Sequence, residues 1–169
     1  MNKYIITLLL SFLFASSAAA ALKLNDTAPI FSLRDIEGND FYLSQYVGAS
    51  KKEKGNGLIL SFFASWCVAC RNELPLINSH VDELRDKGIK VVIIDLKEDF
   101  DTIGALLEEL KVDKPVVLSD RYGKVSEKYQ VRFLPTTFFI GADGQVKDII
   151  FGEMKDQREL KTAAEKLLK

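Results

Sequence analysis

The sequence predicts an α/β fold with a central mixed sheet flanked by helices and an antiparallel hairpin in front of it. Apolar runs of strand length alternate with helical apolar stripes after residue 57, an alternation typical of a sheet covered by helices. The last two expected strands flank Gly141–Gly144, whose Asp-Gly signal favours a hairpin turn. The 169 residues are 47% hydrophobic and 28% charged, which suits one globular domain.

The first twenty residues carry the pattern of an export signal. Lys3 precedes an almost unbroken apolar run of twelve residues, Tyr4–Ala15, and small residues fill 16–21. Such a sequence is typical of a cleaved secretory signal peptide. We therefore expect a signal peptide over 1–20, a single domain over 21–169 and a periplasmic location. The alternative is an uncleaved membrane anchor, but a bilayer span takes about 20 apolar residues.

The domain begins with a predicted hairpin. Phe31–Leu33 and Phe41–Leu43 each alternate apolar and polar residues, and the turn-forming segment Glu37–Asp40 lies between them. The near-continuous apolar run Leu58–Phe63 then predicts a strand that is buried on both faces.

A long amphipathic helix follows that strand and ends at Gly88. Its apolar positions recur at steps of four and three, as one face of a helix requires. They are Cys70, Leu74, Ile77, Val81 and Leu84.

Strands and helices continue to alternate to the end of the chain, and the apolar patterns give their approximate bounds. We expect strands over 90–95, 115–118, 136–140 and 146–151, and helices over 100–110, 124–129 and about 160–167.

The chain contains two cysteines, Cys67 and Cys70, at the junction of the buried strand and the long helix. A disulfide-stapled domain would carry more cysteines at wider spacing. The free amides and the dipole at a helix N-terminus stabilise a thiolate, which is the reactive form of cysteine. We therefore expect Cys67 to attack a substrate disulfide and the more buried Cys70 to resolve the mixed disulfide.

Composition argues against several other classes of function. A net charge of −1 gives no electrostatic footprint for nucleic acid. A C-x-x-C pair can supply half of a zinc site, but zinc takes four ligands. The one histidine, His80, lies about three helical turns from the cysteines, so we predict no metal site. We expect no cofactor other than the redox-active disulfide.

Several segments resemble thioredoxin-fold oxidoreductases, in particular the exported TlpA/ResA branch. Ser65–Pro75 resembles their active site, and Ala28–Leu33 resembles the hairpin that precedes it. Tyr129–Phe138 resembles the region around the cis-proline of the fold, and Asp143–Gly144 matches the turn after it. The resemblance implies a thioredoxin fold with an N-terminal β-hairpin and a strand–helix insertion.

The resemblance also implies which residues bind substrate. It predicts a cis peptide bond before Pro135, which would lie beside the cysteines and turn the Leu134 backbone toward an extended substrate segment. Thr136 and a partly exposed Trp66 complete the expected contact surface.

Glu73 is the third residue expected to take part in catalysis. It follows Cys70 by three positions, at the margin of the buried stripe. The resemblance implies that a glutamate at this place influences thiol ionisation. Ser61 stands where cytoplasmic thioredoxins have a buried aspartate, so Glu73 is the expected proton-transfer group.

The predicted function is an exported thiol-disulfide oxidoreductase. The resemblance implies that it reduces disulfides in partner proteins, with apocytochrome c as one candidate substrate. We expect a monomer, although the sequence does not define the oligomeric state. A membrane thiol carrier of the DsbD/CcdA type would supply electrons. The residues between the cysteines, Val68 and Ala69, influence the reduction potential of the pair, and the sequence does not give its value. A disulfide oxidant or isomerase is therefore an alternative.

Two further alternatives remain at this stage. One is a copper-binding assembly factor that uses the cysteine pair, which would need His80 in the site. The other is a peroxide-reducing enzyme of the same fold, which has Thr or Ser three positions before its reactive cysteine. Ala64 occupies that position here, so the pattern fails.

Overall fold

The computed structural model describes residues 21–169, and the predicted signal peptide over 1–20 lies outside them. Each strand and helix expected from the sequence is present, with bounds that differ by a few residues. The elements are β1 (Ser32–Arg34), β2 (Asp40–Tyr42), β3 (Gly57–Phe63), α1 (Val68–Asp86), β4 (Ile89–Leu96), α2 (Phe100–Leu110), β5 (Val116–Asp120), α3 (Lys124–Lys128), β6 (Thr136–Gly141), β7 (Val146–Phe151) and α4 (Gln157–Glu165). Short 3₁₀ turns at Leu43–Gln45 and Lys166–Leu168 were not predicted.

The central sheet is mixed, as predicted, and has the strand order β5-β4-β3-β6-β7. Strand β4 runs parallel to both β3 and β5, whereas β6 runs antiparallel to β3 and to β7. Strands β1 and β2 pair antiparallel as a separate hairpin. Parallel strands need a crossover between them, and α1 and α2 supply these connections.

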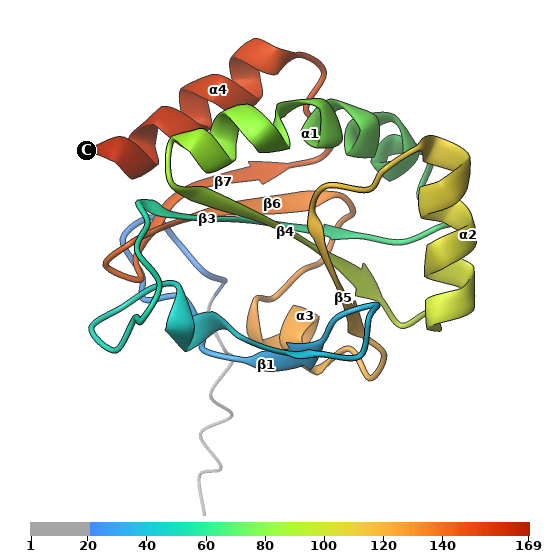
Figure 1. Cartoon of the computed structure of the whole chain (residues 1–169), viewed down its shortest axis with the longest axis horizontal. Helices are drawn as coiled ribbons and strands as arrows, with labels where there is room; N and C mark the ends of the chain where they lie inside the picture. Colours follow the sequence, from blue (N-terminus) through green and yellow to red (C-terminus); the bar gives the residue numbers. More distant parts are fainter. Residues whose placement is uncertain (1–20) are drawn as a thin grey trace, which may run out of the picture.

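Strand β3 is buried on both faces because different elements cover the two faces of the sheet (Figure 1). On one face, Ile59 packs with residues of α1 and α4. On the same face, Phe63 packs with residues of α1 and α2. Leu58 and Phe62 pack on the other side with aromatic residues of the hairpin and of the segment after α3. Because both faces are covered, all seven residues of β3 are buried.

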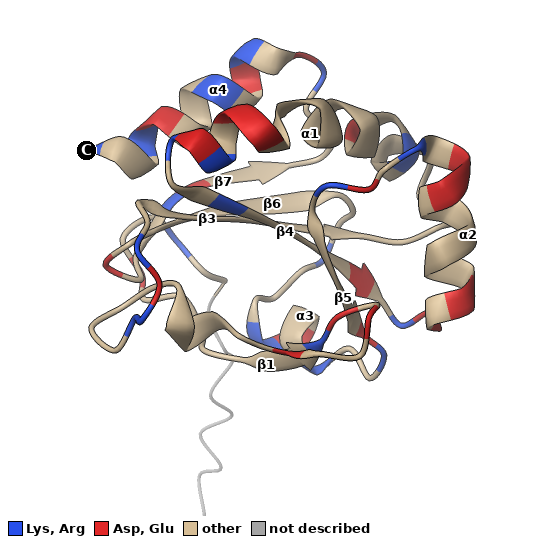
Figure 2. Cartoon of the chain, viewed as in Figure 1, with Lys and Arg blue, Asp and Glu red and all other residues tan. Residues whose placement is uncertain are grey.

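Charge follows the same layering (Figure 2). The central strands are almost free of charged residues, while acidic and basic residues gather on the outer sides of the helices and in the loops. One exception lies at the carboxyl end of β4, which holds a fully buried Asp95. In parallel sheets, functional side chains gather beyond the carboxyl ends of the strands, and the cysteine pair lies at the neighbouring end of β3.

No helix within residues 21–169 is both long and apolar enough to cross a membrane.

Candidate functional site

The cysteine pair lies where β3 gives way to α1. Cys67 is itself the N-cap of α1, with extended backbone angles, one residue later than the Ser65–Trp66 region favoured by the sequence. Its sulfur accepts a hydrogen bond from the Cys70 backbone N–H at 3.1 Å. Within the described chain, no acidic residue lies in the first turn of α1. The partial positive charge of the helix end is therefore available to a sulfur anion on Cys67.

A disulfide bond joins Cys67 and Cys70. The two residues differ in exposure: Cys67 is 7% exposed, whereas Cys70 is fully buried between Phe63, Leu74 and the apolar face of α2. A partner can therefore reach the first sulfur and not the second.

Glu73 lies much deeper than the sequence indicated. The whole residue is 1% exposed, where the sequence placed it at the margin of the stripe. Ser61 on β3 donates a hydrogen bond to its Oε1 at 3.2 Å, and Thr137 on β6 lies 3.3 Å from the same oxygen. The Met154 backbone N–H donates to Oε2 at 2.8 Å. The Thr137 hydroxyl also lies 2.9 Å from Ser61 Oγ, to which it donates. Two hydroxyl groups and one backbone N–H therefore surround this buried carboxyl group, and we call this set the Glu73 network.

Burial raises the pKa of Glu73 from 4.5 to about 7, against the opposing effect of these hydrogen bonds. A carboxyl group that titrates near neutral pH can both accept and return a proton under physiological conditions. Ser61, which replaces the aspartate of cytoplasmic thioredoxins, supports this carboxyl group directly.

The loop before β6 carries the remaining predicted site residues. The Leu134–Pro135 peptide bond is cis, as predicted. Leu134 packs against the cluster that contains both cysteines. The prediction for Thr136 needs correction: this residue is 1% exposed, and its hydroxyl donates to the Phe133 carbonyl at 2.7 Å. Thr136 is therefore too buried to form part of an exposed contact surface, and its hydroxyl holds the loop at Phe133.

Exposed apolar side chains surround the disulfide. Trp66 is 68% exposed, Val68 is 73% exposed and Phe133 is 69% exposed. They line a groove of about 450 Å³ that also contains Cys67 and Leu134. Large exposed apolar side chains that gather in one place are typical of a protein contact surface. Phe133 was missed at the sequence level because nothing in its neighbourhood indicated an outward side chain.

The histidine lies away from the cysteines, as its spacing on α1 indicated. One ring nitrogen of His80 lies 2.9 Å from the Leu76 carbonyl, and the other lies 3.3 Å from the Gln157 side chain. Within residues 21–169, no cluster of three or more potential metal-ligating side chains is formed.

A second group of acidic residues, not singled out from the sequence, lies beside the active-site loop. Asp95 is the penultimate residue of β4. Glu98 lies just after the strand and accepts hydrogen bonds from Ser65, two residues before Cys67. The available signal was a carboxylate directly after the apolar run Val91–Ile94.

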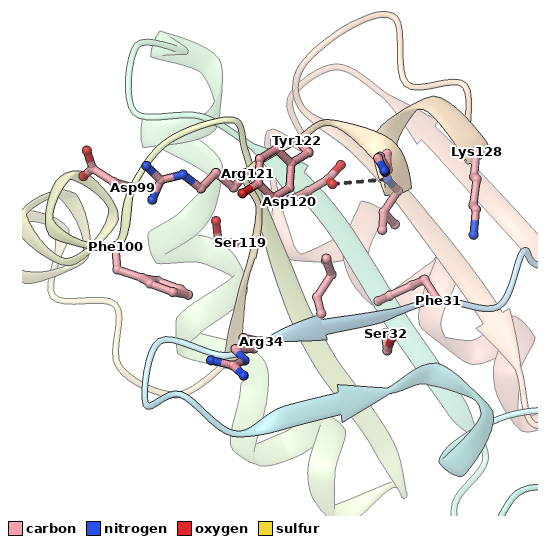
Figure 3. Close-up of a pocket in the computed structure, with 13 residues that line it drawn as sticks. Phe31, Ser32, Arg34, Asp99, Phe100, Ser119, Asp120, Arg121, Tyr122 and Lys128 are labelled. Atoms are coloured by element: carbon pink, nitrogen blue, oxygen red, sulfur yellow. Dashed lines mark hydrogen bonds between the residues drawn. The ribbon is translucent and has the colours of Figure 1, made fainter.

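A separate hollow of about 460 Å³ lies between β1, the end of β5 and α3 (Figure 3). Its wall includes Phe31, Phe100 and Tyr122, and neither cysteine lines it. At its edge, the Asp120 carboxylate accepts hydrogen bonds from the backbone N–H groups of Val125 and Ser126 at the start of α3.

Comparison with known proteins agrees with this geometry. The family model described as AhpC/TSA family matches residues 24–149. The thiol-disulfide oxidoreductase ResA of Geobacillus kaustophilus is 33% identical over 134 residues, which cover 79% of this chain and 72% of that protein. ResA of Bacillus cereus is 31% identical over 139 residues, 82% of this chain and 76% of the relative.

Solved structures show the same fold. The thiol:disulfide interchange protein DsbE from Chlorobium tepidum has a TM-score of 0.76 at 27% identity and covers 88% of this chain and 100% of its own. The peroxidoxin BcpB from Mycobacterium tuberculosis has a TM-score of 0.71 at 25% identity, over 87% and 97% of the two chains.

The fold, the cysteine pair at the helix end and these similarities agree. The chain belongs to the AhpC/TSA family and, within its thioredoxin-like fold, is a thiol-disulfide oxidoreductase of the ResA type.

Proposed function

We propose that the protein reduces disulfide bonds in exported partner proteins. The observation that carries this proposal is the asymmetry of the cysteine pair: Cys67 caps α1 beside an apolar groove, and Cys70 is fully buried behind it. This asymmetry supports a division of roles in which Cys67 meets the partner and Cys70 releases it.

The reaction begins with the reduced dithiol. The Cys67 thiolate attacks one sulfur of the partner disulfide, which breaks that bond and releases the other partner sulfur as a thiolate that takes up a proton. Cys70 then loses its proton and attacks the Cys67 sulfur of the mixed disulfide. The second partner thiol departs, two electrons have passed to the partner, and the Cys67–Cys70 disulfide remains.

Glu73 is proposed as the acceptor for the Cys70 proton. Both residues lie on α1, three positions apart, and both are buried. A carboxylate inside the protein is a stronger base than one in water, and the pKa of about 7 matches the operating pH. The Glu73 network holds the carboxylate in place.

The groove defines the part of the partner that is bound. We propose that Trp66, Val68 and Phe133 contact apolar side chains that flank the partner cysteine, and that the Leu134 backbone beside Pro135 pairs with its extended chain. Thr136 contributes by supporting this loop.

The reducing direction, the exported location and the monomeric state belong to the proposal. The export pattern of residues 1–20 and the ResA relatives support it. A membrane thiol carrier of the DsbD/CcdA type would restore the dithiol, and apocytochrome c is the proposed substrate to test first.

Trapping of the mixed disulfide tests the mechanism. Cys70→Ser removes the resolving thiol, so partners are expected to remain covalently attached to Cys67 and to be released by dithiothreitol. The double variant Cys67→Ser/Cys70→Ser is the matched control. Failure of the single variant to retain any disulfide-linked protein from the exported fraction contradicts the proposal.

The reducing direction is tested by equilibrating the cysteine pair with glutathione buffers. We expect a potential near that of thioredoxin, about −270 mV; a value near that of DsbA, about −120 mV, would identify an oxidant instead.

A further inference from the structure

Two carboxyl groups lie in contact beside the active-site loop, and we refer to Asp95 and Glu98 as the acid pair. Asp95 is fully buried at the end of β4. Its Oδ1 accepts a hydrogen bond from the Glu98 backbone N–H at 2.9 Å. Its Oδ2 is the one buried side-chain oxygen or nitrogen in residues 21–169 without a hydrogen-bond donor. A buried oxygen without a partner costs about 1–3 kcal/mol, so its state needs a physical explanation.

Glu98 connects this group to the cysteines. Its two carboxylate oxygens accept hydrogen bonds from the Ser65 backbone N–H at 2.6 Å and from the Ser65 hydroxyl at 2.5 Å. Such short bonds are typical of a charged acceptor. Ser65 lies two residues before Cys67, in the segment between β3 and α1 that also carries Trp66. Glu98 therefore holds the backbone that leads into the helix cap.

The two carboxyl groups also lie close enough for each to act on the ionisation of the other. Two carboxylates in contact cannot both be ionised without strong repulsion, so such pairs share a proton. A proton on Asp95 Oδ2 turns the unpartnered oxygen into a donor and leaves the charge on Glu98, where Ser65 binds it.

We infer that the acid pair shares one proton and, through Ser65, positions the Ser65–Cys67 segment for disulfide exchange. The inference rests on the proposed function only for the use of that segment. Asp95 and Glu98 are positioning residues, because the bonds that they make reach Ser65 and not the sulfur atoms.

Neighbouring acidic residues act on both members of the pair. Asp120 on β5 acts on Asp95 and favours its protonation, whereas Asp99 in the same loop acts against the charge on Glu98. Figure 3 shows Asp99 facing Arg121 at this end of the molecule, and the Ser119 hydroxyl donates to the Glu98 carbonyl. Further negative charge beside Asp95 makes its ionisation more costly.

Burial, followed by the contact with Glu98, raises the pKa of Asp95 to about 8. Burial and the nearby Asp99 act to raise the pKa of Glu98, but the interactions with Asp95 and with Ser65 hold it below its ordinary value. When solvent base removes the shared proton, two negative charges lie in contact. We expect them to separate, and Ser65 then loses at least one of its two bonds.

The chain contains one tryptophan, Trp66, and it lies in the segment that the pair holds. The test is the fluorescence of the oxidised protein, in which no thiol titrates, between about pH 6 and pH 9, below the ordinary range of tyrosine. The wild type is expected to show a one-proton step near pH 8. Asp95→Asn keeps a donor toward Glu98 that has no proton to lose, so the step is expected to disappear and the low-pH signal to persist.

Two further variants keep the test decisive. Glu73→Gln is the matched control, because it removes the other raised carboxyl group and should leave the step in place. Glu98→Gln removes the neighbouring charge and should move the step to lower pH. Absence of the step in the wild type, or its persistence in Asp95→Asn, overturns the inference.

A vibrational measurement answers the same question if Asp95→Asn does not fold. At pH 6 the oxidised Glu73→Gln variant should show the C=O stretch of a buried protonated carboxyl group, which disappears on titration through pH 8. Absence of that band refutes the shared proton. The proposed disulfide exchange would be unaffected by this result, because it is tested by trapping through Cys67.

Discussion

The outer and inner halves of the active site differ in chemistry, and each contains one cysteine. The outer half is an exposed apolar rim formed by Trp66, Val68 and Phe133 around Cys67. The inner half is a buried polar group, Glu73 with its donors, one helical turn from the buried Cys70. This division separates partner binding from proton transfer. A substitution in one half should therefore leave the function of the other half unchanged, so that each can be measured separately.

Loss of the outer sulfur has the largest expected effect. Cys67→Ala removes the nucleophile, so turnover of a protein disulfide should fall to the uncatalysed level. Insulin reduction with dithiothreitol as donor measures this. Residual activity above that of Cys67→Ala/Cys70→Ala would show that Cys70 reacts with partners directly and would contradict the division.

The inner half should dominate the pH dependence of stability. The folded pKa of Glu73 is about 7 against 4.5 when unfolded, so the folded state keeps a proton that the unfolded state loses, and stability falls as pH rises between these values. Glu73→Gln has no carboxyl group at this position, so its stability should not fall with pH for this reason. From pH 4 to pH 8, oxidised wild type should lose about 3 kcal/mol relative to the variant.

Urea unfolding of the two oxidised proteins at both pH values measures the difference. Because Asp95 and His80 are present in both, their contributions cancel. Equal pH dependence in the two proteins would show that Glu73 ionises as an exposed glutamate does.

A smaller effect is expected for one donor of the Glu73 network. Thr137→Val keeps the shape of the side chain but removes a hydroxyl near Glu73 Oε1. Loss of a donor to the charged form should raise the pKa of Glu73 further and cost about 1 kcal/mol at pH 8. Carboxyl titration by NMR checks the direction of the shift, and an unchanged or lower value contradicts it.

The smallest effect on stability is expected in the outer half. Phe133→Ser changes a side chain that is 69% exposed, so the free energy of unfolding should change by about 0.5 kcal/mol or less. The KM for a protein disulfide should rise several-fold, while that for glutathione disulfide stays the same. Equal effects on both substrates would show that Phe133 does not bind the partner.

The sequence predicted the fold well because its signals are local. The apolar run 58–63, the helical stripe from Cys70 to Leu84 and the Asp143–Gly144 turn each define an element without reference to the rest of the chain. The cysteine pair could be assigned to a helix N-terminus for the same reason.

The inner half could not be predicted because it depends on strand register. Thr137 reaches Glu73 because it is the partner of Ser61 in the β3–β6 ladder, and Met154 N–H arrives from a loop 81 residues away in sequence. The contact between Glu98 and Ser65 likewise joins two loops. Thr136 was expected in the contact surface, but its burial depends on which face of the sheet it lies on, and the sequence around the preceding turn does not define this.

The central claim is that the end of α1 ionises Cys67 while Cys70 waits behind it. The most direct measurement is the rate of iodoacetamide alkylation of each thiol in the reduced protein at pH 7, followed by mass spectrometry. The account predicts that Cys67 reacts much faster than free cysteine and that Cys70 is protected. A Cys67 thiol no more reactive than free cysteine would contradict it.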